Sequence, residues 1–395
     1  MLATKLAAAA PSLSATPVPM LDVSRENGRL RDQIDAAMAE VCDSGAFVHG
    51  PACARFEAAM AEYCGTEYAV GCASGSDAIL LALLALGVGP GDEVIVPSFT
   101  FFATASTVWR LGAKPVFADI RPETFNLDPA DVLYKLTTAT KAIIPVHLFG
   151  QCAEMDEIRQ IATAAHGIPI IEDACQAIGA EYKGQRVGSI GTFGCFSFYP
   201  TKNLGGFGDG GLITTNDGEL AAKLRVLRDH GQQPRYYHHF VGLNSRLDAL
   251  QAAVLGVKLP HLEAWSAARE RHANRYAKEF AQRGLGNQIL APTVADDCHH
   301  VWNQYTIRVT GGRRDELQKH LAERKIGSAI YYPVPLHLQK CFAALDYQAG
   351  ALPATEQACR EVLSLPVYPE LTAAEQGTVI DAIAGFCQGK ARSAA

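Results

Sequence analysis

A lysine followed by a run of glycines is the feature of this sequence most suited to covalent chemistry. Lys202 lies in FSFYPTKNLGGFGDGG, residues 196–211, where a β-rich run ends in a polar turn. A lysine amine forms a Schiff base with a carbonyl group if burial or neighbouring charge keeps it neutral. The alternative is an ordinary surface lysine in a loop, because lysine side chains are mostly exposed. The glycines, which remove side-chain bulk around the amine, favour the chemical interpretation.

The same glycines permit a rival interpretation as a dinucleotide site. Gly206, Gly208 and Gly211 satisfy the G-x-G-x-x-G fingerprint. That fingerprint has to open a helix, whereas Gly211 leads into the strand-like run Leu212–Thr215. The pattern therefore argues against a pyrophosphate site at this position.

Two adjacent carboxylates mark a second candidate segment, IIEDACQAIGA, residues 170–180. A β-rich run ends there at Glu172 and Asp173, and open α/β sheets bind ligands at the carboxyl ends of their strands. An aspartate beside a pyridine nitrogen keeps that nitrogen protonated, so that the ring withdraws electrons, and Gln176 is able to hydrogen-bond a phenolic oxygen. We expect one of the two carboxylates to be functional. The alternative is a carboxylate that only caps the free N–H groups of a helix.

A third segment, ASGSDAILLALLAL at residues 73–86, has the features of an anion site. Gly75 and Ser76 precede an apolar helix, and the free N–H groups and dipole at a helix N-terminus attract phosphate. The alternative is an ordinary N-cap by Ser76 or Asp77.

Aromatic residues follow another expected strand, in PSFTFFATA at residues 97–105. The ring of Phe101 is placed to stack on a planar cofactor. Phe99 and Phe102 are expected in the core.

The elements that position these residues alternate between β-rich and helical runs from about residue 66, a pattern typical of βαβ units and a mostly parallel sheet. The expected strands are Tyr68–Gly71, Glu93–Pro97, Pro115–Asp119, Ala142–Val146, Ile168–Glu172, Cys195–Phe198 and Leu212–Thr215. An amphipathic helix is expected over Gly218–His230, with Asp217 as N-cap and Gly231 closing its end. A strand near Tyr305–Val309 and a helix near Arg314–Arg324 follow, in a smaller α+β part.

Length and composition limit the classes of protein that remain. The chain has 395 residues, of which 48% are hydrophobic and 19% charged, as in globular enzymes of two or three domains. We expect a leader at 1–20, a large domain at 21–258 and a small domain at 259–395. The net charge of −6, without a block of Lys and Arg, argues against nucleic acid and anionic membranes as partners.

The cysteines and apolar runs indicate the compartment. The longest apolar run, Ala78–Val88, is about half the ~20 residues needed to span a bilayer. Eleven cysteines without a C-x-x-C pair favour reduced thiols in the cytoplasm. No metal site is expected.

With these segments in this order, the chain resembles the DegT/DnrJ/EryC1/StrS family of sugar aminotransferases, pyridoxal-phosphate (PLP) enzymes of fold type I. The resemblance covers about residues 20–390. It implies a three-layer fold with a mostly parallel central sheet and a smaller C-terminal α+β domain. The motifs that carry it are GAFVHGP (45–51), SGSDA (74–78), GDEVIVPSFTFFATA (91–105), TKAIIPVHLFGQ (140–151), EDACQA (172–177), FSFYPTKNLG (196–205), GLNSRLDALQAA (242–253) and YYPVPLH (331–337).

The resemblance also implies roles for individual residues. Lys202 forms the Schiff base with PLP, and Asp173 contacts the ring nitrogen as the second catalytic residue. The further cofactor-binding residues are Gly75, Ser76 and Ser197 at the phosphate, Gln176 near the phenolic oxygen, Phe101 on the ring, and Asn244, which reaches the phosphate from the neighbouring subunit of a homodimer. Residues expected near the sugar are Phe47, Tyr332 and His337.

The reaction implied is a transamination in two halves. L-Glutamate converts PLP to pyridoxamine phosphate (PMP), and a nucleotide-linked keto-sugar then takes the amine. Ser245, in GLNSRLDALQAA, favours a 3-keto sugar by the same resemblance. Alternatives are a 4-keto sugar, a PLP-dependent sugar dehydratase, or a non-catalytic PLP-binding regulator. Ser76 and Ile178 depart from the family's commoner Thr and His at these positions.

Overall fold

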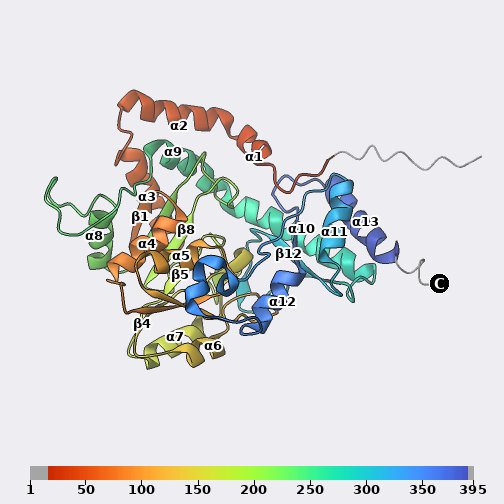
Figure 1. Cartoon of the computed structure of the whole chain (residues 1–395). Helices are drawn as coiled ribbons and strands as arrows, with labels where there is room; N and C mark the ends of the chain where they lie inside the picture. The colour runs from red at the N-terminus through yellow and green to blue at the C-terminus, as the bar shows by residue number, and fades with distance from the viewer. Residues whose placement is uncertain (1–16, 390–395) are drawn as a thin grey trace, which may run out of the picture.

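The computed structural model describes residues 17–389, and a mixed sheet forms its centre (Figure 1). The strand order is β3-β2-β4-β5-β8-β9-β1, in which the bridges Ile143–Ile170 and Val146–Asp173 join β4 to β5. Only β9 runs antiparallel to its neighbours among these strands, which confirms the mostly parallel sheet. The strands are β1 (Tyr68–Cys72), β2 (Glu93–Pro97), β3 (Lys114–Ala118), β4 (Thr140–Ile143), β5 (Ile171–Asp173), β8 (Phe193–Ser197) and β9 (Gly211–Thr215).

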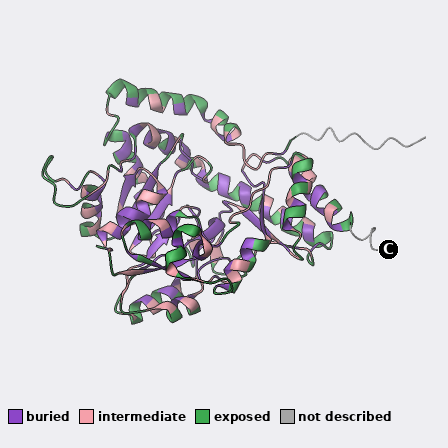
Figure 2. Ribbon diagram, in the orientation of Figure 1, coloured by how far each residue is buried: buried purple, intermediate pink, exposed green. Residues whose placement is uncertain are grey.

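Helices cover both faces of this sheet, so the large part has three layers. On one face α3 (Pro51–Cys64), α7 (Met155–Ala164) and α9 (Ala249–Lys258) share an apolar cluster with strand residues. On the other face the sheet packs against α4 (Gly75–Ala85), α5 (Ala103–Arg110) and α8 (Gly218–Leu227). Figure 2 shows the result, with buried strands between helices whose outer sides are exposed. Strands buried on both faces explain the continuous apolar runs, such as Val94, Ile95 and Val96, which are fully buried.

Helix α8 ends earlier than the predicted span of 218–230. Its N-terminus is as expected, because the Asp217 carboxylate accepts hydrogen bonds from the N–H groups of Glu219 and Leu220. At the other end the carbonyls of Leu227 and Arg228 accept from Leu243 and Ser245, in chain that returns from a long loop. These tertiary partners replace the donors of a further helical turn, and the helix stops at Leu227.

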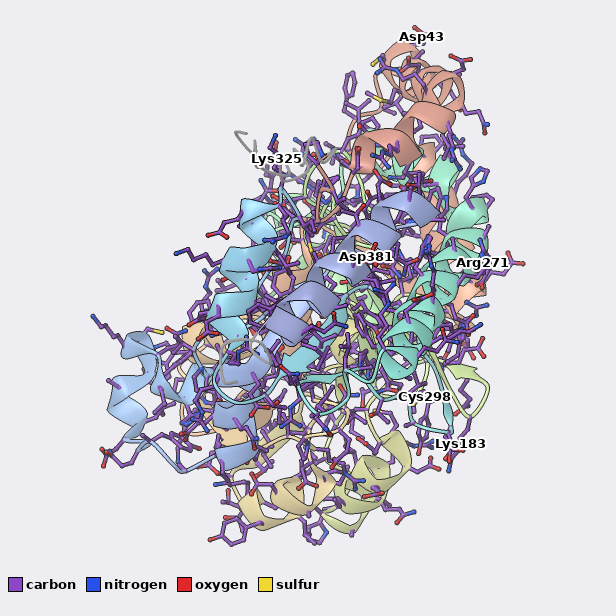
Figure 3. The ribbon with its side chains drawn as sticks, turned by 90° about the vertical axis from the view of Figure 1, so that its right-hand side faces the viewer. Asp43, Lys183, Arg271, Cys298, Lys325 and Asp381 are labelled. Carbon is purple, nitrogen blue, oxygen red and sulfur yellow. The ribbon has the colours of Figure 1, made fainter. Side chains whose placement is uncertain are left out.

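The C-terminal part is an antiparallel sheet with helices against it. Its strands pair in the order β10-β12-β13, and β12 covers the predicted Tyr305–Val309. Figure 3 shows α10, α11 and α13 on one side, with Arg271 and Asp381 among the charged side chains that point outward. The elements are β10 (Ile289–Leu290), β12 (Tyr305–Val309), β13 (Val362–Leu365), α10 (Leu262–Gln282), α11 (Arg314–Glu323) and α13 (Ala373–Gly389).

Packing crosses the predicted boundary at residue 258 in both directions. Val18 is buried among residues of the C-terminal cluster and pairs with Ile326, so residues 17–20 are not part of a free leader; residues 1–16 of the predicted leader lie outside the described residues. Conversely, Leu336 and Phe342 pack on the large sheet. The division into 21–258 and 259–395 stays a prediction.

The remaining elements are short or peripheral. None of the helices within residues 17–389 is long and apolar enough to cross a bilayer. The short or peripheral elements are α1 (Val23–Arg29), α2 (Arg31–Ser44), α6 (Pro129–Lys135), α12 (Pro353–Glu361), β6 (Glu181–Tyr182), β7 (Gln185–Arg186) and β11 (Cys298–His299).

Candidate active site

Asp173 is the last residue of β5 and lies buried at the carboxyl edge of the sheet. Its Oδ2 accepts a hydrogen bond of 2.7 Å from the hydroxyl of Thr104, on α5, and its Oδ1 accepts one of 3.3 Å from the N–H of Cys175. The carboxylate is therefore held in one orientation by two elements. Thr104 was not among the predicted residues, and its only sequence signal is its position in the helix that follows PSFTFF.

The neighbouring Glu172 has a different role. Its fully buried carboxylate accepts hydrogen bonds from the N–H groups of Gly188, Ile190 and Gly191, at 2.6 to 2.9 Å. It also contacts His147 Nε2 at 2.9 Å, while His147 Nδ1 accepts from a backbone N–H. Nε2 therefore carries the ring proton and donates to Glu172. Glu172 fastens the chain between β5 and β8, which leaves Asp173 as the carboxylate available for chemistry.

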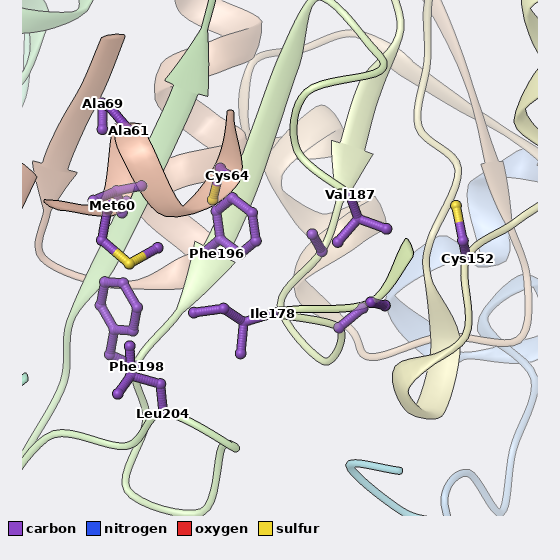
Figure 4. Packing of buried hydrophobic residues seen from close by; sticks show 14 of the residues in the cluster. Met60, Ala61, Cys64, Ala69, Cys152, Ile178, Val187, Phe196, Phe198 and Leu204 are labelled. Carbon is purple, nitrogen blue, oxygen red and sulfur yellow. The ribbon is translucent and has the colours of Figure 1, made fainter. Parts of the chain in front are cut away.

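Lys202 lies in a closed turn that follows β8. Its N–H donates to the carbonyl of Tyr199 at 2.9 Å, and the N–H of Gly206 donates to the carbonyl of Phe198 at 2.8 Å. Figure 4 shows Phe198 and Leu204, on either side of this turn, packed in the core cluster. The turn is thereby fixed at both ends by buried side chains.

The amine of Lys202 has no hydrogen-bond or ion-pair partner among residues 17–389. Burial lowers its pKa below that of an ordinary lysine, while the nearby Cys175 and Asp173 act in the opposite direction. A lysine with a lowered pKa and no ion pair has a larger neutral, nucleophilic fraction near pH 7.

The N-terminus of α4 approaches the ends of β5 and β8 closely. An ideal Cβ on Gly75 would lie 2.7 Å from both Cys175 Sγ and the Cβ of Ser197, so only glycine fits without a shift of these neighbours. The Ser74 hydroxyl caps the helix by accepting from Asp77 N–H at 3.1 Å. The cap is therefore Ser74, not the predicted alternatives Ser76 or Asp77. Ser76 stays half-buried in the first turn, whose N–H groups face outward along the axis.

Gln176 and Phe101, which follow the ends of β5 and β2, both contact Tyr332. The Gln176 amide accepts from the N–H of Phe149 and donates to the hydroxyl of Tyr332, both at 2.9 Å. The ring of Phe101 lies 6.4 Å from that of Tyr332 and is 56% exposed. One N–H of Gln176 and the open face of Phe101 stay available to a ligand. Phe99 is in the core as predicted, whereas Phe102 is 44% exposed because it packs at the surface against Phe342.

The structure does not bring His337 to the surface of this site. Its side chain is fully buried: Nδ1 accepts from the Ser98 hydroxyl at 2.7 Å, and Nε2 lies 3.4 Å from Glu356. A ligand could reach it only by displacing these neighbours. Its predicted contact with the sugar stays a prediction.

Phe47 and Asn244 lie outside the cluster, on exposed chain. Phe47 is 48% exposed, and its carbonyl accepts from the N–H at the start of α9. Asn244 is exposed, and its side chain makes no hydrogen bond within residues 17–389. Both stay available to a second molecule.

The donor set of the cluster fits PLP. The Lys202 amine, which has no ion pair, suits the aldehyde of the cofactor, and the fixed Asp173 carboxylate suits its pyridinium N–H. The N-terminus of α4, with Ser76 and Ser197, suits its phosphate. Phe101 offers an exposed ring for stacking. No group of three or more His, Cys, Asp or Glu side chains within residues 17–389 is arranged to hold a metal ion.

Comparison with known proteins agrees with this chemistry. The profile of the DegT/DnrJ/EryC1/StrS aminotransferase family matches residues 29–384. A "pleiotropic regulatory protein" of Geobacillus stearothermophilus is 52% identical, over 93% of this chain and 98% of its own. A dTDP-3-amino-3,4,6-trideoxy-α-D-glucose transaminase of Streptomyces venezuelae is 46% identical, over 94% and 97%.

A solved structure shares the fold. The crystal structure of S. venezuelae DesV in complex with a ketimine intermediate superposes with a TM-score of 0.91 at 46% identity, covering 95% of this chain and 99% of that one. The family match spans most of the chain, and the cluster supplies the groups that PLP chemistry requires. The chain therefore belongs to the DegT/DnrJ/EryC1/StrS family and is a PLP-dependent aminotransferase of fold type I.

Proposed function

We propose that this enzyme transfers the amino group of L-glutamate to C3 of a nucleotide-linked keto-sugar, with PLP and PMP as alternating forms of the cofactor. The observation that carries the proposal is the Lys202 amine, which has a lowered pKa and no ion pair and lies near the fixed Asp173 carboxylate. The product named for the S. venezuelae transaminase, a 3-amino sugar, supports the position of amination.

Each residue of the cluster has a defined task in this proposal. Lys202 binds the cofactor covalently and, when released, moves a proton to and from the reacting carbon. Asp173 holds the proton on the ring nitrogen, and Thr104 holds Asp173. The N-terminus of α4, with Gly75, Ser76 and Ser197, binds the phosphate. When bound, PLP supplies an electron-withdrawing ring that stabilises negative charge at the carbon losing the proton.

The remaining predicted residues complete the pocket. Phe101 covers one face of the cofactor ring, and Gln176 donates its free N–H to the phenolic oxygen. Tyr332, held by Gln176, and Phe47 line the sugar side. Asn244 reaches the phosphate of a second copy of the chain.

Ser245 contributes to the choice of substrate only indirectly. It is fully buried, donates to Asp77 at 2.7 Å and accepts from the N–H of Ala73 at 3.2 Å. A serine in this place fixes the start of α4 and does not face the pocket. Amination at C3 therefore depends on the relative's product, and a 4-keto sugar is the alternative substrate.

A homodimer with shared sites is part of the proposal. The loop that follows α8 projects from the body in Figure 1, and apolar side chains on it are largely exposed, although Arg235 lies over the ring of Tyr236 and Lys223 over that of Phe240. The exposed apolar residues are Tyr236 (74% exposed), Tyr237 (68%), Phe240 (45%) and Val241 (92%). Burial of such side chains against a second copy of the chain is favourable. Because Asn244 follows this loop in the chain, such an interface would also place Asn244 near the second copy.

Absorbance of the cofactor tests the reaction. The band of bound PLP is expected to disappear with excess L-glutamate and to return when a 3-keto nucleotide-sugar is added. Return of the band with a 4-keto sugar and not with a 3-keto sugar would mean that the enzyme aminates C4 and not C3. A band that glutamate never changes would contradict the proposed donor and favour a dehydratase or a regulator.

Mixing two inactive variants tests the shared site. Lys202→Ala and Asn244→Ala each damage a different half of every site. A hybrid dimer contains one site with both residues intact, so random exchange of subunits is expected to restore about a quarter of wild-type activity. Activity no higher than the sum of the separate variants would mean that Asn244 does not act across the interface.

A regulatory role without turnover is the second candidate function, because the Geobacillus relative is named a regulatory protein. A protein of that kind would bind PLP yet show no turnover with any keto-sugar and glutamate. Turnover would exclude it.

We also propose the cytoplasm as the site of action. All eleven cysteines are free thiols in the structure, including the exposed Cys42 and Cys341, which fits a reducing compartment.

A further inference from the structure

A buried ion pair lies behind the turn that carries Lys202. Lys258, the last residue of α9, is 2% exposed, and its amine donates to the carbonyl of Gly205 at 2.7 Å. The same amine lies 2.8 Å from Oε1 of Glu26, on α1, which is 8% exposed. Three segments that are far apart in the sequence therefore meet at one ammonium group.

The position of Gly205 explains why a donor is needed there. An ideal Cβ at Gly205 would lie 2.4 Å from the carbonyl oxygen of Pro200, so the turn closes on itself with Lys202 between these two residues. The Gly205 carbonyl accepts from Lys258 and not from the turn. A buried carbonyl without a donor costs free energy, and the ammonium group satisfies it.

The turn is held at three successive residues after Lys202, by three different means. The Asn203 amide donates to the carbonyl of Val301 at 2.8 Å and accepts from Asn303 at 2.9 Å. Leu204 is fully buried in the core. Gly205 is bound by Lys258. Of these three supports, only the contact at Gly205 depends on a buried charge.

Burying that charge is expensive, which indicates a task beyond stability. Two desolvated charges commonly stabilise a fold no more than a well-packed apolar pair of similar volume. An apolar residue at 258 would, however, leave the Gly205 carbonyl without a donor. The pair thus supplies a rigid hydrogen bond to the turn, and Glu26 is the carboxylate that lies against the Lys258 amine.

We propose that Lys258, with Glu26 as its partner, is a positioning residue. It fixes the position of the turn that carries Lys202 relative to the carboxylate of Asp173. The inference rests on the proposed role of Lys202 but is tested separately from it. Lys258 touches neither cofactor nor substrate and acts through the Gly205 carbonyl.

Hydrogen exchange in the cofactor-free protein measures this role directly. In Lys258→Met, the amides of Lys202 and Gly206 are expected to exchange at least about fivefold faster than in wild type, because one support of the turn is gone. Arg25→Met is the matched control: Arg25 is also on α1 and pairs with Glu375, but it does not touch the turn. Unchanged exchange in a folded Lys258→Met protein would overturn the proposal.

A double variant separates positioning from stability. Glu26→Leu combined with Lys258→Met removes both charges of the pair together, so its melting temperature is expected to recover relative to Lys258→Met alone. The Gly205 carbonyl still lacks its donor, so the fast exchange is expected to persist. Recovery of both quantities together would mean that the pair is only structural.

The loaded enzyme supplies the second readout. In the double variant we expect kcat to fall about tenfold with KM for the sugar nearly unchanged, and the pH midpoint of the bound-PLP absorbance to shift. If wild type itself does not react with glutamate, the proposed function fails, while the exchange experiment still decides the role of Lys258. If Lys258→Met does not fold, Glu26→Gln withdraws the countercharge alone and is expected to give a smaller increase at the same amides; no increase would overturn the proposal.

Discussion

The carboxyl edge of the central sheet and the loop that follows α8 both carry predicted site residues, yet they are built in opposite ways. At the sheet edge Asp173, Glu172 and Gln176 are buried, and each side chain has hydrogen-bond partners from other elements. On the loop, Tyr236 and Val241 are largely exposed. The groups that we assign to the cofactor ring are thus fixed within one chain, whereas the loop that carries Asn244, our proposed second contact to the phosphate, is open.

This difference has a physical cause. Chemistry at a cofactor requires polar groups held within fractions of an ångström, which buried strands and helix ends provide. Recognition of varied substrates needs surfaces that tolerate substitution, which loops provide. Changes at the sheet edge should therefore affect the chemical step, and changes on the loop should affect assembly.

Removal of the Lys202 amine is expected to have the largest effect. Lys202→Ala should lower turnover by at least about 10³-fold and abolish the absorbance of covalently bound PLP, because the nucleophile and the proton carrier are lost together. The fold should persist, since the side chain makes no hydrogen bond within the described residues. Turnover and the visible spectrum are the measurements, and full activity would reject the assignment.

Replacement of the carboxylate should come next. Asp173→Asn is expected to bind PLP but to lower kcat by about 10²-fold or more, because a neutral amide does not hold the proton on the ring nitrogen. Thr104→Val keeps the charge of Asp173 but removes its 2.7 Å hydrogen bond from Thr104, together with the 3.1 Å contact between the hydroxyls of Thr104 and Thr100, and should cost about tenfold. Equal effects of the two variants on kcat would mean that orientation, and not charge, is what Asp173 contributes.

On the loop side, the exposed tyrosines are expected to control association. Replacing Tyr236 and Tyr237 by serine should raise the dissociation constant of the dimer at least about tenfold, since large aromatic side chains dominate such interfaces. Light scattering on dilution measures this. Tyr134→Ser is the control, because Tyr134 is 81% exposed on α6, at the bottom of the view in Figure 1. A similar loss of dimer in that variant would contradict a specific role for the loop.

The smallest effect is expected where α1 meets α13. Arg25 lowers the pKa of Glu375 to about 2, from an ordinary value of 4.5. The pair therefore stabilises the fold above about pH 4.5, and this contribution is lost as the pH falls from 4.5 toward 2. Because Arg25 is about a third exposed, we expect Glu375→Gln to cost about 1 kcal/mol at pH 7.

Chemical denaturation at pH 7 and in acid measures this contribution. The difference between Glu375→Gln and wild type should shrink steadily below pH 4.5. A difference that stays constant across this range would show that the charge of Glu375 is not its source.

Much of the cofactor side could be read from local patterns. The span of β2 agrees with prediction because a continuous apolar run marks a strand buried on both faces. The span of β12 agrees too, although its apolar residues alternate with Thr306 and Arg308. The polar residues at the strand ends then meet at one edge of the sheet, and Asp173 with Lys202 are neighbours for that reason. The roles of Thr104 and Lys258 could not be predicted, because a threonine in a helix and a lysine at a helix end have no distinctive local pattern.

The sequence by itself determined the order of the elements and the type of sheet, since these follow from periodicity, while its resemblance to a known family supplied the residues proposed to bind PLP. Only the tertiary structure decided which groups have partners. It buried His337 against Ser98, ended α8 at Leu227 through bonds from the returning chain, and placed Val18 in the C-terminal core. These outcomes depend on hydrogen bonds and packing between segments far apart in the chain, which local patterns of residues do not encode.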